Sequence, residues 1–340
     1  MKIAFVVNGI DTEISEYTTT RLALAAAKLE HEVWYVGVGD IDYESDEAMR
    51  ARGHRAMETA QDDLESFLTR LQDDESRAHI VLDDFDAVWL RNDTIEDMQS
   101  RPWASNIGVE FGQMLTGRGV TVVNDPVGLS RAGSKLYLQE FPAEVRPRCI
   151  VTRSVDEVQS FVARTGRTVV KPLYGAKGRN VFMIAGEDDP NLSQMVEAVV
   201  EDGYAIAQEF VEGAEEGDLR LFLLNGEPLQ LDGTYAATRR IPQGNDVRAN
   251  ISTGGKPAEA VIGDTELQVA ALLKDRLVED GMFFVGVDII GDKVVEINAE
   301  SPGGLQSVEH FTGIDFGLTL CEALEERVAS WPASLKKKVS

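Results

Sequence analysis

The stretch Phe283-Phe-Val-Gly-Val-Asp-Ile-Ile-Gly-Asp-Lys-Val-Val-Glu-Ile-Asn298 is the most informative segment of the chain. It contains two apolar runs on either side of a turn at Gly291, and this pattern predicts a β-hairpin. Asp288 and Glu296 interrupt the apolar runs. An unpaired carboxylate within an apolar strand is energetically costly, so we expect both carboxylates to have a function.

The length of the hairpin turn determines how its polar side chains face one another. A two-residue turn would place Asp288 opposite Val295, and its carboxylate would then face away from Glu296. A three-residue loop that includes Lys293 would place Asp288 opposite Glu296, with Asn298 on the same face. Two carboxylates and an amide oxygen together suit hard cations such as Mg²⁺. The alternative is a strand whose polar residues face water.

A candidate phosphate-binding segment lies earlier in the chain, in Val169-Val-Lys171-Pro-Leu-Tyr174-Gly175-Ala-Lys-Gly178. A lysine at the end of a strand can neutralise phosphates, and glycines let backbone N–H groups approach them. The segment is not a Walker A loop, because it lacks the Gly-x4-Gly-Lys-Ser/Thr pattern, and an ordinary turn is the alternative. The hypothesis is strengthened by further cations in the same half of the chain, which are Lys135, Arg220, Arg239, Arg240 and Arg248.

The N-terminal third of the chain predicts a parallel sheet. Strand patterns at 2–8 and 32–38 flank an amphipathic helix at 15–29, and this spacing favours parallel pairing. Further strands are expected within 80–90 and 119–124, whereas the charged segment 44–74 is expected to be helix and mobile loop. The break at Asn124-Asp125-Pro126 predicts a domain boundary.

The remainder of the chain predicts strands and helices interrupted by one long loop. Strands are expected at 205–209 and 219–224, and helices at 129–139 and 316–328. The loop at 239–257 is rich in Gly, Asn and Arg, and its length is typical of a lid.

Composition limits the partners and the compartment of the protein. Its 340 residues include 33 Lys and Arg against 58 Asp and Glu, which gives a net charge of −25. Such an acidic surface repels nucleic acid and anionic lipid, so we expect neither as a partner. No apolar run is long enough for a signal peptide or a membrane span, and Cys149 and Cys321 lie far apart, so we expect reduced thiols in a cytoplasmic protein. The four scattered histidines predict no zinc site.

Taken in order, these segments resemble the ATP-grasp ligases, and most closely the bacterial glutathione synthetases. The first domain contributes Trp89-Leu90-Arg91-Asn92-Asp93 to this resemblance. The other matching stretches are Val123-Asn124-Asp125-Pro126, Ser134-Lys135-Leu136-Tyr137, Val170-Lys171-Pro172-Leu173, Gly217-Asp218-Leu219-Arg220, Arg240-Ile241-Pro242-Gln243-Gly244, Arg248-Ala249-Asn250, Gly254-Gly255, 284–292, Glu296-Ile297-Asn298 and Ser301-Pro302.

The resemblance implies an α/β fold with two domains. An N-terminal parallel-sheet (pre-ATP-grasp) domain would span residues 1–123, and a two-lobed ATP-grasp domain would span residues 124–333. The flap lobe would lie at 135–207 and the C-terminal lobe at 208–333, followed by a tail at 334–340. The resemblance also suggests a homo-oligomer.

The resemblance also implies roles for individual residues. ATP and two Mg²⁺ ions would be the cofactors, with Mn²⁺ as an alternative metal. Asp288, Glu296 and Asn298 would hold the metal, while Arg220 and Arg240 would be the catalytic cations. ATP would be bound by Lys135, Lys171, Tyr174, Gly175, Gly178, Gln208, Glu209, Val211 and Asp218. The small-molecule carboxylate and amino-acid substrates would be bound by Arg91, Arg248, Asn250, Gly255, Ser301, Gly303 and Gly304.

The activity implied by the resemblance is ATP-dependent formation of an amide bond through an acyl-phosphate, with γ-glutamylcysteine and glycine as substrates. The chain departs from the family pattern on the acceptor side, where it has Ser301-Pro-Gly-Gly304 instead of Ser-Pro-Thr. Gln306 and Ser307 replace an expected arginine and acidic residue, and the flap Gly175-Ala-Lys-Gly178 replaces Gly-x-Gly-Gly. One alternative is a related ligase that joins another amino acid to a peptide or small carboxylate. Another is a nucleotide-binding regulator without turnover.

Overall fold

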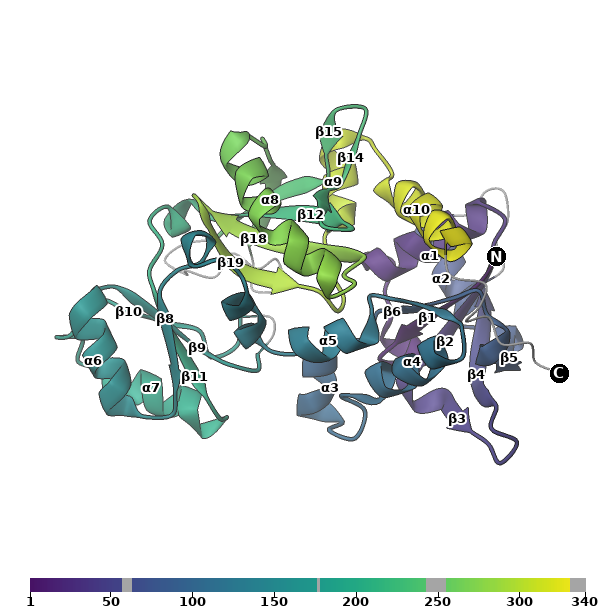
Figure 1. The fold of residues 1–340 in the computed structure, drawn as a ribbon, viewed down its shortest axis with the longest axis horizontal. Coiled ribbons are helices and arrows are strands. Elements are labelled where there is room, and N and C mark those ends of the chain that lie inside the picture. The colour runs from purple at the N-terminus through teal and green to yellow at the C-terminus, as the bar shows by residue number, and fades with distance from the viewer. Residues whose placement is uncertain (57–62, 176–177, 243–254, 331–340) are drawn as a thin grey trace.

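The described part of the chain forms three large β-sheets, one two-stranded sheet and the helices that pack on them (Figure 1). The computed structural model describes residues 1–56, 63–175, 178–242 and 255–330. A seven-stranded sheet comes first in the chain, a four-stranded sheet follows, and a six-stranded sheet completes the set. The expected α/β class is confirmed. Among the described residues, no helix is both long and apolar enough to cross a membrane.

The N-terminal sheet has a parallel centre and an antiparallel edge. Its strand order is β3-β4-β2-β1-β6-β7, with β5 paired to β4. The parallel strands are β1 (Lys2–Val7), β2 (Glu32–Gly37), β6 (Ala87–Leu90) and β7 (Thr121–Val123). The antiparallel strands are β3 (Ile41–Tyr43), β4 (Met49–Ala56) and β5 (Arg77–Val81). The predicted parallel sheet is therefore present at the centre, and the antiparallel strands at its edge were not predicted.

The antiparallel edge contains the strands that sequence patterns missed. In β4, Met49, Ala51 and Gly53 are buried while the arginines between them are only half-buried. This alternation is that of a strand, but small residues and arginines conceal it in the sequence. Among the described residues of the segment 44–74, which was expected to be helix and loop, α2 (Leu64–Leu71) is the α-helix and β4 is a strand. The expected single strand within 80–90 is likewise divided between β5 and β6.

The two ends of the described chain pack against each other beside the N-terminal sheet. Helix α1 (Thr18–Lys28) contacts α10 (Phe316–Ser330), and the two share one apolar core with β1. Figure 1 shows α10, in yellow, alongside α1 in purple. The helices α3 (Thr94–Ser100), α4 (Ile107–Gly117) and α9 (Leu305–Thr312) complete this part of the molecule.

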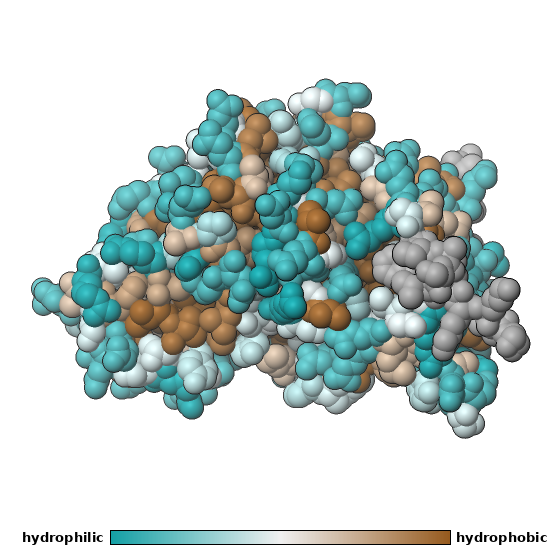
Figure 2. All heavy atoms as spheres, viewed as in Figure 1, coloured by the Kyte–Doolittle hydropathy of each residue, from teal (hydrophilic) through white to brown (hydrophobic). Residues whose placement is uncertain are grey.

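The four-stranded sheet forms a lobe with its own core. Its antiparallel order is β10-β9-β11-β8, and helices α6 (Val155–Thr165) and α7 (Leu192–Glu201) pack on it. In Figure 2, hydrophilic side chains cover most of the visible face, and a hydrophobic patch lies over this lobe. The strands are β8 (Cys149–Thr152), β9 (Thr168–Pro172), β10 (Phe182–Ile184) and β11 (Ala205–Glu209).

The six-stranded antiparallel sheet carries the quoted hairpin as β18 (Phe284–Ile290) and β19 (Lys293–Asn298). Its other strands are β12 (Asp218–Leu224), β13 (Glu227–Pro228), β16 (Ala237–Ile241) and β17 (Lys256–Glu259). A separate small hairpin joins β14 (Gln230–Leu231) and β15 (Thr234–Tyr235), and α8 (Asp264–Glu279) precedes β18. The expected helix at 129–139 is in fact α5 (Pro126–Ala132) followed by a 3₁₀ segment, Lys135–Glu140.

Aromatic rings join the N-terminal sheet to the six-stranded sheet. Trp89 of β6 stacks on Phe5 with ring centroids 5.7 Å apart, and its edge meets Phe283 at 5.4 Å. Phe284 stacks on Phe222 at 5.5 Å. These contacts bury large apolar surfaces and fix the position of β18 relative to β6.

Asn124 adds four hydrogen bonds to the same junction. Its side-chain oxygen accepts from the backbone N–H groups of Phe283 (2.7 Å) and Phe284 (2.8 Å). Its amide nitrogen donates to the carbonyls of Phe284 and Ala299. Because Asn124 is 2% exposed, water cannot replace these bonds.

We predict that Asn124→Ala lowers the free energy of unfolding by roughly 3 kcal/mol or more, since it leaves several buried backbone groups without partners. Urea unfolding followed by tryptophan fluorescence measures this change. Asn191→Ala is the matched control, because Asn191 is exposed and its side chain makes no capping bond. Equal unfolding midpoints for the two variants would contradict the prediction.

Candidate active site

A β-bulge sets the register of the hairpin. Ile290 pairs with Lys293, so the turn has two residues and Gly291 takes a φ of +57°. A register shift between Asp288 and Ile289 nevertheless brings Asp288 opposite Glu296. Neither alternative drawn from the sequence included this bulge. One alternative predicted a two-residue turn, and the other predicted that the two carboxylates face each other. Because β19 contains one extra residue at the bulge, the structure has both features.

Buried ion pairs cross the six-stranded sheet beneath the candidate site. Asp288 is 0% exposed and accepts two bonds of 2.8 Å from Arg220, which lies opposite it on β12. Arg240 of β16 lies 2.6 Å from the same carboxylate. Arg240 also donates to Asp218, at 2.6 and 2.7 Å. The result is a row of alternating charges on one face of the sheet.

The two arginines keep Asp288 ionised. Burial alone would raise the pKa of this carboxyl, but the charges and hydrogen bonds of Arg220 and Arg240 lower its pKa to about 2. A charge this deep in the protein needs such partners, because desolvation is otherwise prohibitive. Asp288 is therefore an anion at any physiological pH.

Two lysines from the flap side extend the row. Lys135 lies 3.0 Å from the carboxylate of Glu296, and Lys171 donates to the carbonyl of Val295 at 3.3 Å. Burial lowers the pKa of Lys171 to about 8; Glu296 opposes this shift and Lys135 adds to it. Burial would raise the pKa of Glu296, but Lys135 and Lys171 outweigh it and hold that pKa below its ordinary value.

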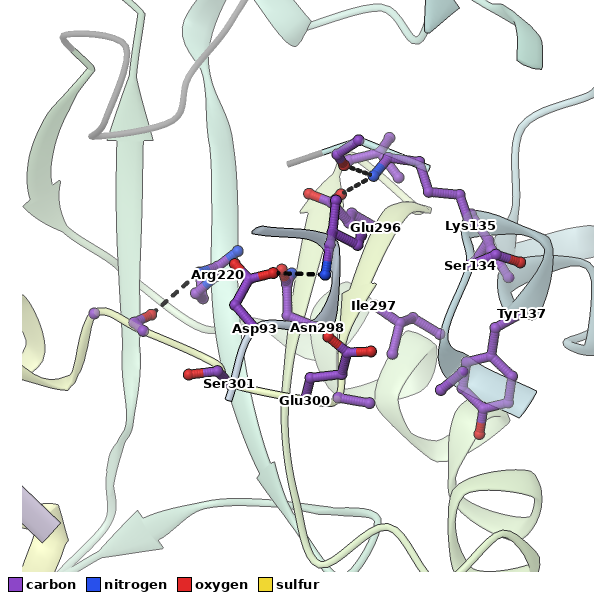
Figure 3. Close-up of a pocket in the computed structure, with 18 of the residues that line it drawn as sticks. Asp93, Ser134, Lys135, Tyr137, Arg220, Glu296, Ile297, Asn298, Glu300 and Ser301 are labelled. Carbon is purple, nitrogen blue, oxygen red and sulfur yellow. Dashed lines mark hydrogen bonds and ion pairs between the residues drawn. The ribbon is translucent and has the colours of Figure 1, made fainter. Parts of the chain in front are cut away.

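Two adjoining cavities lie over these side chains, with volumes of about 460 and 140 Å³. Figure 3 shows Lys135 beside Glu296 in the larger cavity, with Asn298 and Ser301 further along it. The larger cavity is lined by Lys135, Lys171, Gly175, Gln208, Arg220, Arg240, Glu296, Asn298, Ser301, Gly303 and Gly304. The smaller is lined by many of the same residues and by Gly178, Val211, Asp218 and Asp288.

Some predicted site residues lie away from both cavities. Tyr174 is 45% exposed, and Glu209 forms an ion pair with Arg148 at 2.6 Å. Gly255 is buried at the start of the segment that leads into β17. The predicted residues Arg248 and Asn250, and the centre of the expected lid, lie outside the described residues.

The segment after Asn298 is held at four points by the N-terminal part of the chain. These contacts leave Ser301, Gly303 and Gly304 at the wall of the larger cavity. Two of their partners lie in α1 and α3 and two lie just after β6 and β7, so the position of the segment depends on how the two parts pack. They join Asn124 to Ala299, Thr94 to Glu300, Arg91 to Pro302 and Thr18 to Leu305.

Glu300 is the cavity residue that sequence reasoning missed most clearly. Thr94 donates to it from its hydroxyl at 2.5 Å and from its backbone N–H at 3.1 Å. Burial raises the pKa of Glu300 to about 7, although the bonds from Thr94 oppose this. The sequence feature that could have identified Glu300 is its position two residues after Asn298. Glu16, Tyr17 and Asp93 also line this end of the cavity, and no sequence pattern indicated the first two.

The donor set on the hairpin fits a hard divalent cation. Asp288 and Glu296 are neighbours across the strands, and Asn298 donates its amide nitrogen to Asp288 at 3.3 Å. The amide oxygen of Asn298 makes no hydrogen bond to any described residue. Two carboxylates and one amide oxygen on one face match the ligand preference of Mg²⁺. Within the described ranges, no cluster of three or more His, Cys, Asp or Glu side chains offers a different metal site.

Family models match almost the whole described chain. Residues 134–313 match the model described as the ATP-grasp domain of prokaryotic glutathione synthetase, and residues 1–130 match that of its N-terminal domain. The glutathione synthetase of Gloeobacter violaceus is 31% identical over 337 residues, covering 97% of this chain and 96% of the relative. The glutathione synthetase of Synechocystis sp. is 30% identical over 336 residues, covering 97% and 98%.

Solved structures with the same fold have lower sequence identity. D-cycloserine synthetase DcsG superposes with a TM-score of 0.65 at 17% identity, over 96% of this chain and 99% of that one. The ATP-grasp ligase PsnB, complexed with a minimal precursor, Mg and ADP, gives a TM-score of 0.61 at 17% identity, over 96% and 97%. At this identity the likeness concerns the fold alone.

We predict that Glu296→Gln weakens Mg²⁺ binding by about tenfold or more, because a neutral amide replaces one of two carboxylate ligands. Calorimetric titration of Mg²⁺ in the presence of an ATP analogue measures the change, and circular dichroism checks the fold. Asp292→Asn in the same hairpin is the control, since its side chain is exposed and paired only with Lys293. Similar Mg²⁺ affinity in the two variants would argue against this metal site.

The low pKa of Lys171 predicts that ATP binding weakens by several-fold above about pH 8. The folded-state pKa is lowered, so the positive charge is present below about pH 8 and is lost as the pH rises through that value. Binding of an ATP analogue between about pH 7 and about pH 9 measures the effect. Lys171→Arg retains its charge over this range and should show a flatter pH dependence; a profile as steep as that of the wild type would refute the role of Lys171.

Proposed function

Because the chain belongs to the prokaryotic glutathione synthetase family of ATP-grasp ligases, we propose that it joins γ-glutamylcysteine to glycine while ATP is converted to ADP and phosphate. A glutathione synthetase-type ATP-grasp enzyme is an ADP-forming carbon–nitrogen ligase. The single observation that carries the proposal is the row of alternating charges beneath the larger cavity. Such a row can receive a triphosphate and a carboxylate together, although the chain has a net charge of −25.

Lys135 and Lys171 are proposed to bind the phosphates of ATP. Both line the two cavities; Lys171 lies on β9 of the four-stranded sheet, and Lys135 begins the 3₁₀ segment that contacts β19. The smaller cavity has Gln208 and Val211 in its wall, where a flat apolar base can insert between the sheets. Asp218, ion-paired to Arg240, would lie at the edge of the nucleotide.

Asp288, Glu296 and Asn298 are proposed to hold Mg²⁺, with two ions as the expected number and Mn²⁺ as the alternative. A metal bound there would neutralise charge on the phosphates and stabilise the charge that develops during phosphoryl transfer. The ion pairs seen here support this role. Lys135 now neutralises Glu296, and its long side chain can turn towards a phosphate instead.

Arg220 and Arg240 are proposed to orient the substrate carboxylate that attacks the γ-phosphate. The resulting acyl-phosphate then reacts with the amine of the acceptor, and an oxyanion forms at the carbonyl carbon. Two fixed guanidinium groups beside this position stabilise the oxyanion at no cost of reorganisation. Arg220 is well fixed, because it is bound to Asp288 and also donates to the carbonyl of Gly303 at 3.1 Å.

A second candidate function has the same chemistry but a different acceptor. The cavity wall contains Ser301, Gly303 and Gly304, followed by Gln306 and Ser307. Gly303 and Gly304 leave more room in the cavity than the threonine of the family's Ser-Pro-Thr pattern would. Neither Gln306 nor Ser307 carries a charge. This end of the cavity could therefore take a larger amine than glycine, such as another amino acid.

Other parts of the proposal concern organisation and location. We propose the domain ranges 1–123 and 124–333, with a flap lobe within the second. The homo-oligomer stays a prediction. Both cysteines are free thiols, which supports a reducing compartment such as the cytoplasm.

A screen of ADP release across carboxylate and amine pairs tests the function. We expect γ-glutamylcysteine with glycine and Mg²⁺-ATP to give ADP and an equal amount of glutathione. Omission of either substrate should reduce ADP release to the background rate. If that pair is inactive while γ-glutamylcysteine with another amino acid turns over, the second candidate replaces the first.

A further inference from the structure

A buried carboxylate holds together three elements, one of which lines the larger cavity. Asp280 is 3% exposed and lies at the end of α8, just before the turn that leads into β18. It accepts hydrogen bonds from Arg131 of α5 (2.6 Å), Tyr137 of the 3₁₀ segment (2.9 Å) and Arg276 of α8 (2.6 Å). A carboxylate accepts at both oxygens, so this one side chain can join all three elements.

The partners of Asp280 keep it ionised. Burial raises the pKa of this carboxyl, but the hydrogen bonds from Arg276, Tyr137 and Arg131 outweigh burial and hold the pKa below its ordinary value. The two arginines already neutralise the carboxylate, so the hydroxyl of Tyr137 is not needed to balance its charge. The bond from Tyr137 therefore contributes geometry, because it fixes the 3₁₀ segment relative to the end of α8.

The backbone at Asp280 packs directly on α5. A Cβ atom at Gly128 would lie 1.9 Å from the carbonyl oxygen of Asp280, so a side chain there would force the two elements apart. The backbone N–H of Asp125 donates to the carbonyl of Gly281 at 3.1 Å. Because Gly281 lies three residues before the first residue of β18, the start of this hairpin strand is fixed against α5.

Tyr137 connects the 3₁₀ segment to this framework. Its side chain is 3% exposed, and its ring meets that of Phe141 edge to face with centroids 5.1 Å apart. The segment also contacts β19. A 3₁₀ helix has poorer internal hydrogen-bond geometry than an α-helix, so its position depends on contacts such as these.

Lys135 is the cation that the 3₁₀ segment presents to the cavity. It begins the segment two residues before Tyr137. Its ammonium lies 3.0 Å from the carboxylate of Glu296 and donates to the carbonyl of Gly175. Figure 3 shows Lys135 reaching towards Glu296 while the hydroxyl of Tyr137 points away from it. Since a lysine stem is long and flexible, the place that its ammonium occupies depends on how firmly its backbone is held.

We propose that Asp280 is a positioning residue, which through Tyr137 holds Lys135 where the phosphates of ATP bind. This inference rests on the proposed function and deepens it, because it extends the phosphate-binding machinery to a residue away from the cavities. Asp280 is not among the described residues that line either cavity. Loss of its bond to Tyr137 would let the 3₁₀ segment shift along β19, and the ammonium of Lys135 would shift with it.

Tyr137→Phe tests the bond to Asp280, because it removes the hydroxyl and keeps the ring. We expect the KM for ATP to rise by about tenfold and the KM for γ-glutamylcysteine to change by less than about twofold, since only a phosphate contact is displaced. A merely structural defect would lower the amount of folded enzyme, and so reduce the apparent kcat at an unchanged KM. An unchanged KM for ATP would therefore overturn the inference.

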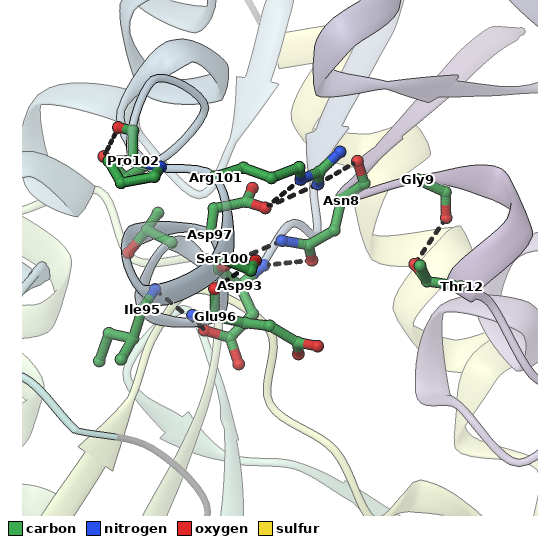
Figure 4. A network of polar contacts seen from close by, with 12 residues as sticks. Asn8, Gly9, Thr12, Asp93, Ile95, Glu96, Asp97, Ser100, Arg101 and Pro102 are labelled. Atoms are coloured by element: carbon green, nitrogen blue, oxygen red, sulfur yellow. Dashed lines mark hydrogen bonds and ion pairs between the residues drawn. The ribbon is translucent and has the colours of Figure 1, made fainter.

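Asp280→Asn tests the carboxylate itself, and Asp97→Asn is its matched control. Asp97 is 1% exposed and accepts from Arg101, four residues later in α3, at 3.1 and 2.6 Å. Figure 4 shows this pair in a separate polar network. We expect the KM for ATP to rise by about tenfold or more in Asp280→Asn and by less than about twofold in Asp97→Asn. Equal KM values for ATP in the two variants would contradict the role of Asp280.

A double-mutant cycle tests whether the effect passes through Lys135. Calorimetric titration of an ATP analogue measures the affinity of the full-length protein and its variants. We expect Tyr137→Phe to weaken binding by about tenfold in the wild type and by less than about twofold in a Lys135→Met background, because the displaced group is then already absent. An equal loss of affinity in both backgrounds would reject the inference.

Failure of the proposed function can be told apart from failure of this inference. If the wild type releases no ADP with γ-glutamylcysteine and any amine, the proposed function fails. The calorimetric cycle requires no turnover, so it still tests the position of Lys135. A loss of affinity on Tyr137→Phe that disappears in the Lys135→Met background supports the inference, and no loss of affinity rejects it. This cycle leaves Asp280 unchanged, so it also serves if Asp280→Asn does not fold.

Discussion

The bond between Asp288 and Arg220 is the interaction on which the rest of the site depends. A fully buried carboxylate must be neutralised, and its neutralisation requires β12 and β18 to pair so that these two residues face each other. Arg240 then reaches the same carboxylate from the next strand, which fixes the position of β16. The register of the sheet, the location of the cations and the ionisation of Asp288 therefore follow from one electrostatic requirement. A change in register would remove more than one of these features together.

The junction between the N-terminal sheet and the six-stranded sheet is the second constraint. Packed aromatic rings and the four hydrogen bonds of Asn124 hold the two together. The segment after Asn298 is bound from the N-terminal side at four points, so the position of the cavity wall at Ser301, Gly303 and Gly304 depends on residues far away in the chain. The carboxylates of the hairpin are placed by one sheet, while the far end of the larger cavity is placed by both sheets.

Much of the fold could be predicted because its signals are local. The hairpin at 283–298, the first two strands and the helix between them all show strong apolar periodicity, and each forms as expected. Strand β4 could not be predicted, because several of its buried residues, Ala51, Gly53 and Ala56, are small and arginines lie between them. For the site, Lys135, Lys171 and Glu296 could be grouped from their order in the chain. The burial of Arg91 behind Pro302 could not, since it depends on how residues 211 positions apart pack.

The amino-acid order by itself indicated the local chemistry of two segments, namely carboxylates within apolar strands and a lysine before a glycine loop. Those patterns are set by neighbouring residues, so they can be read without knowledge of the fold. The identity of each partner required the folded chain. The bulge that brings Asp288 opposite Glu296 and the pairing of Asp288 with Arg220 both arise from strand order and packing. Such contacts join distant segments, and their geometry follows from the whole fold because no short stretch contains both partners.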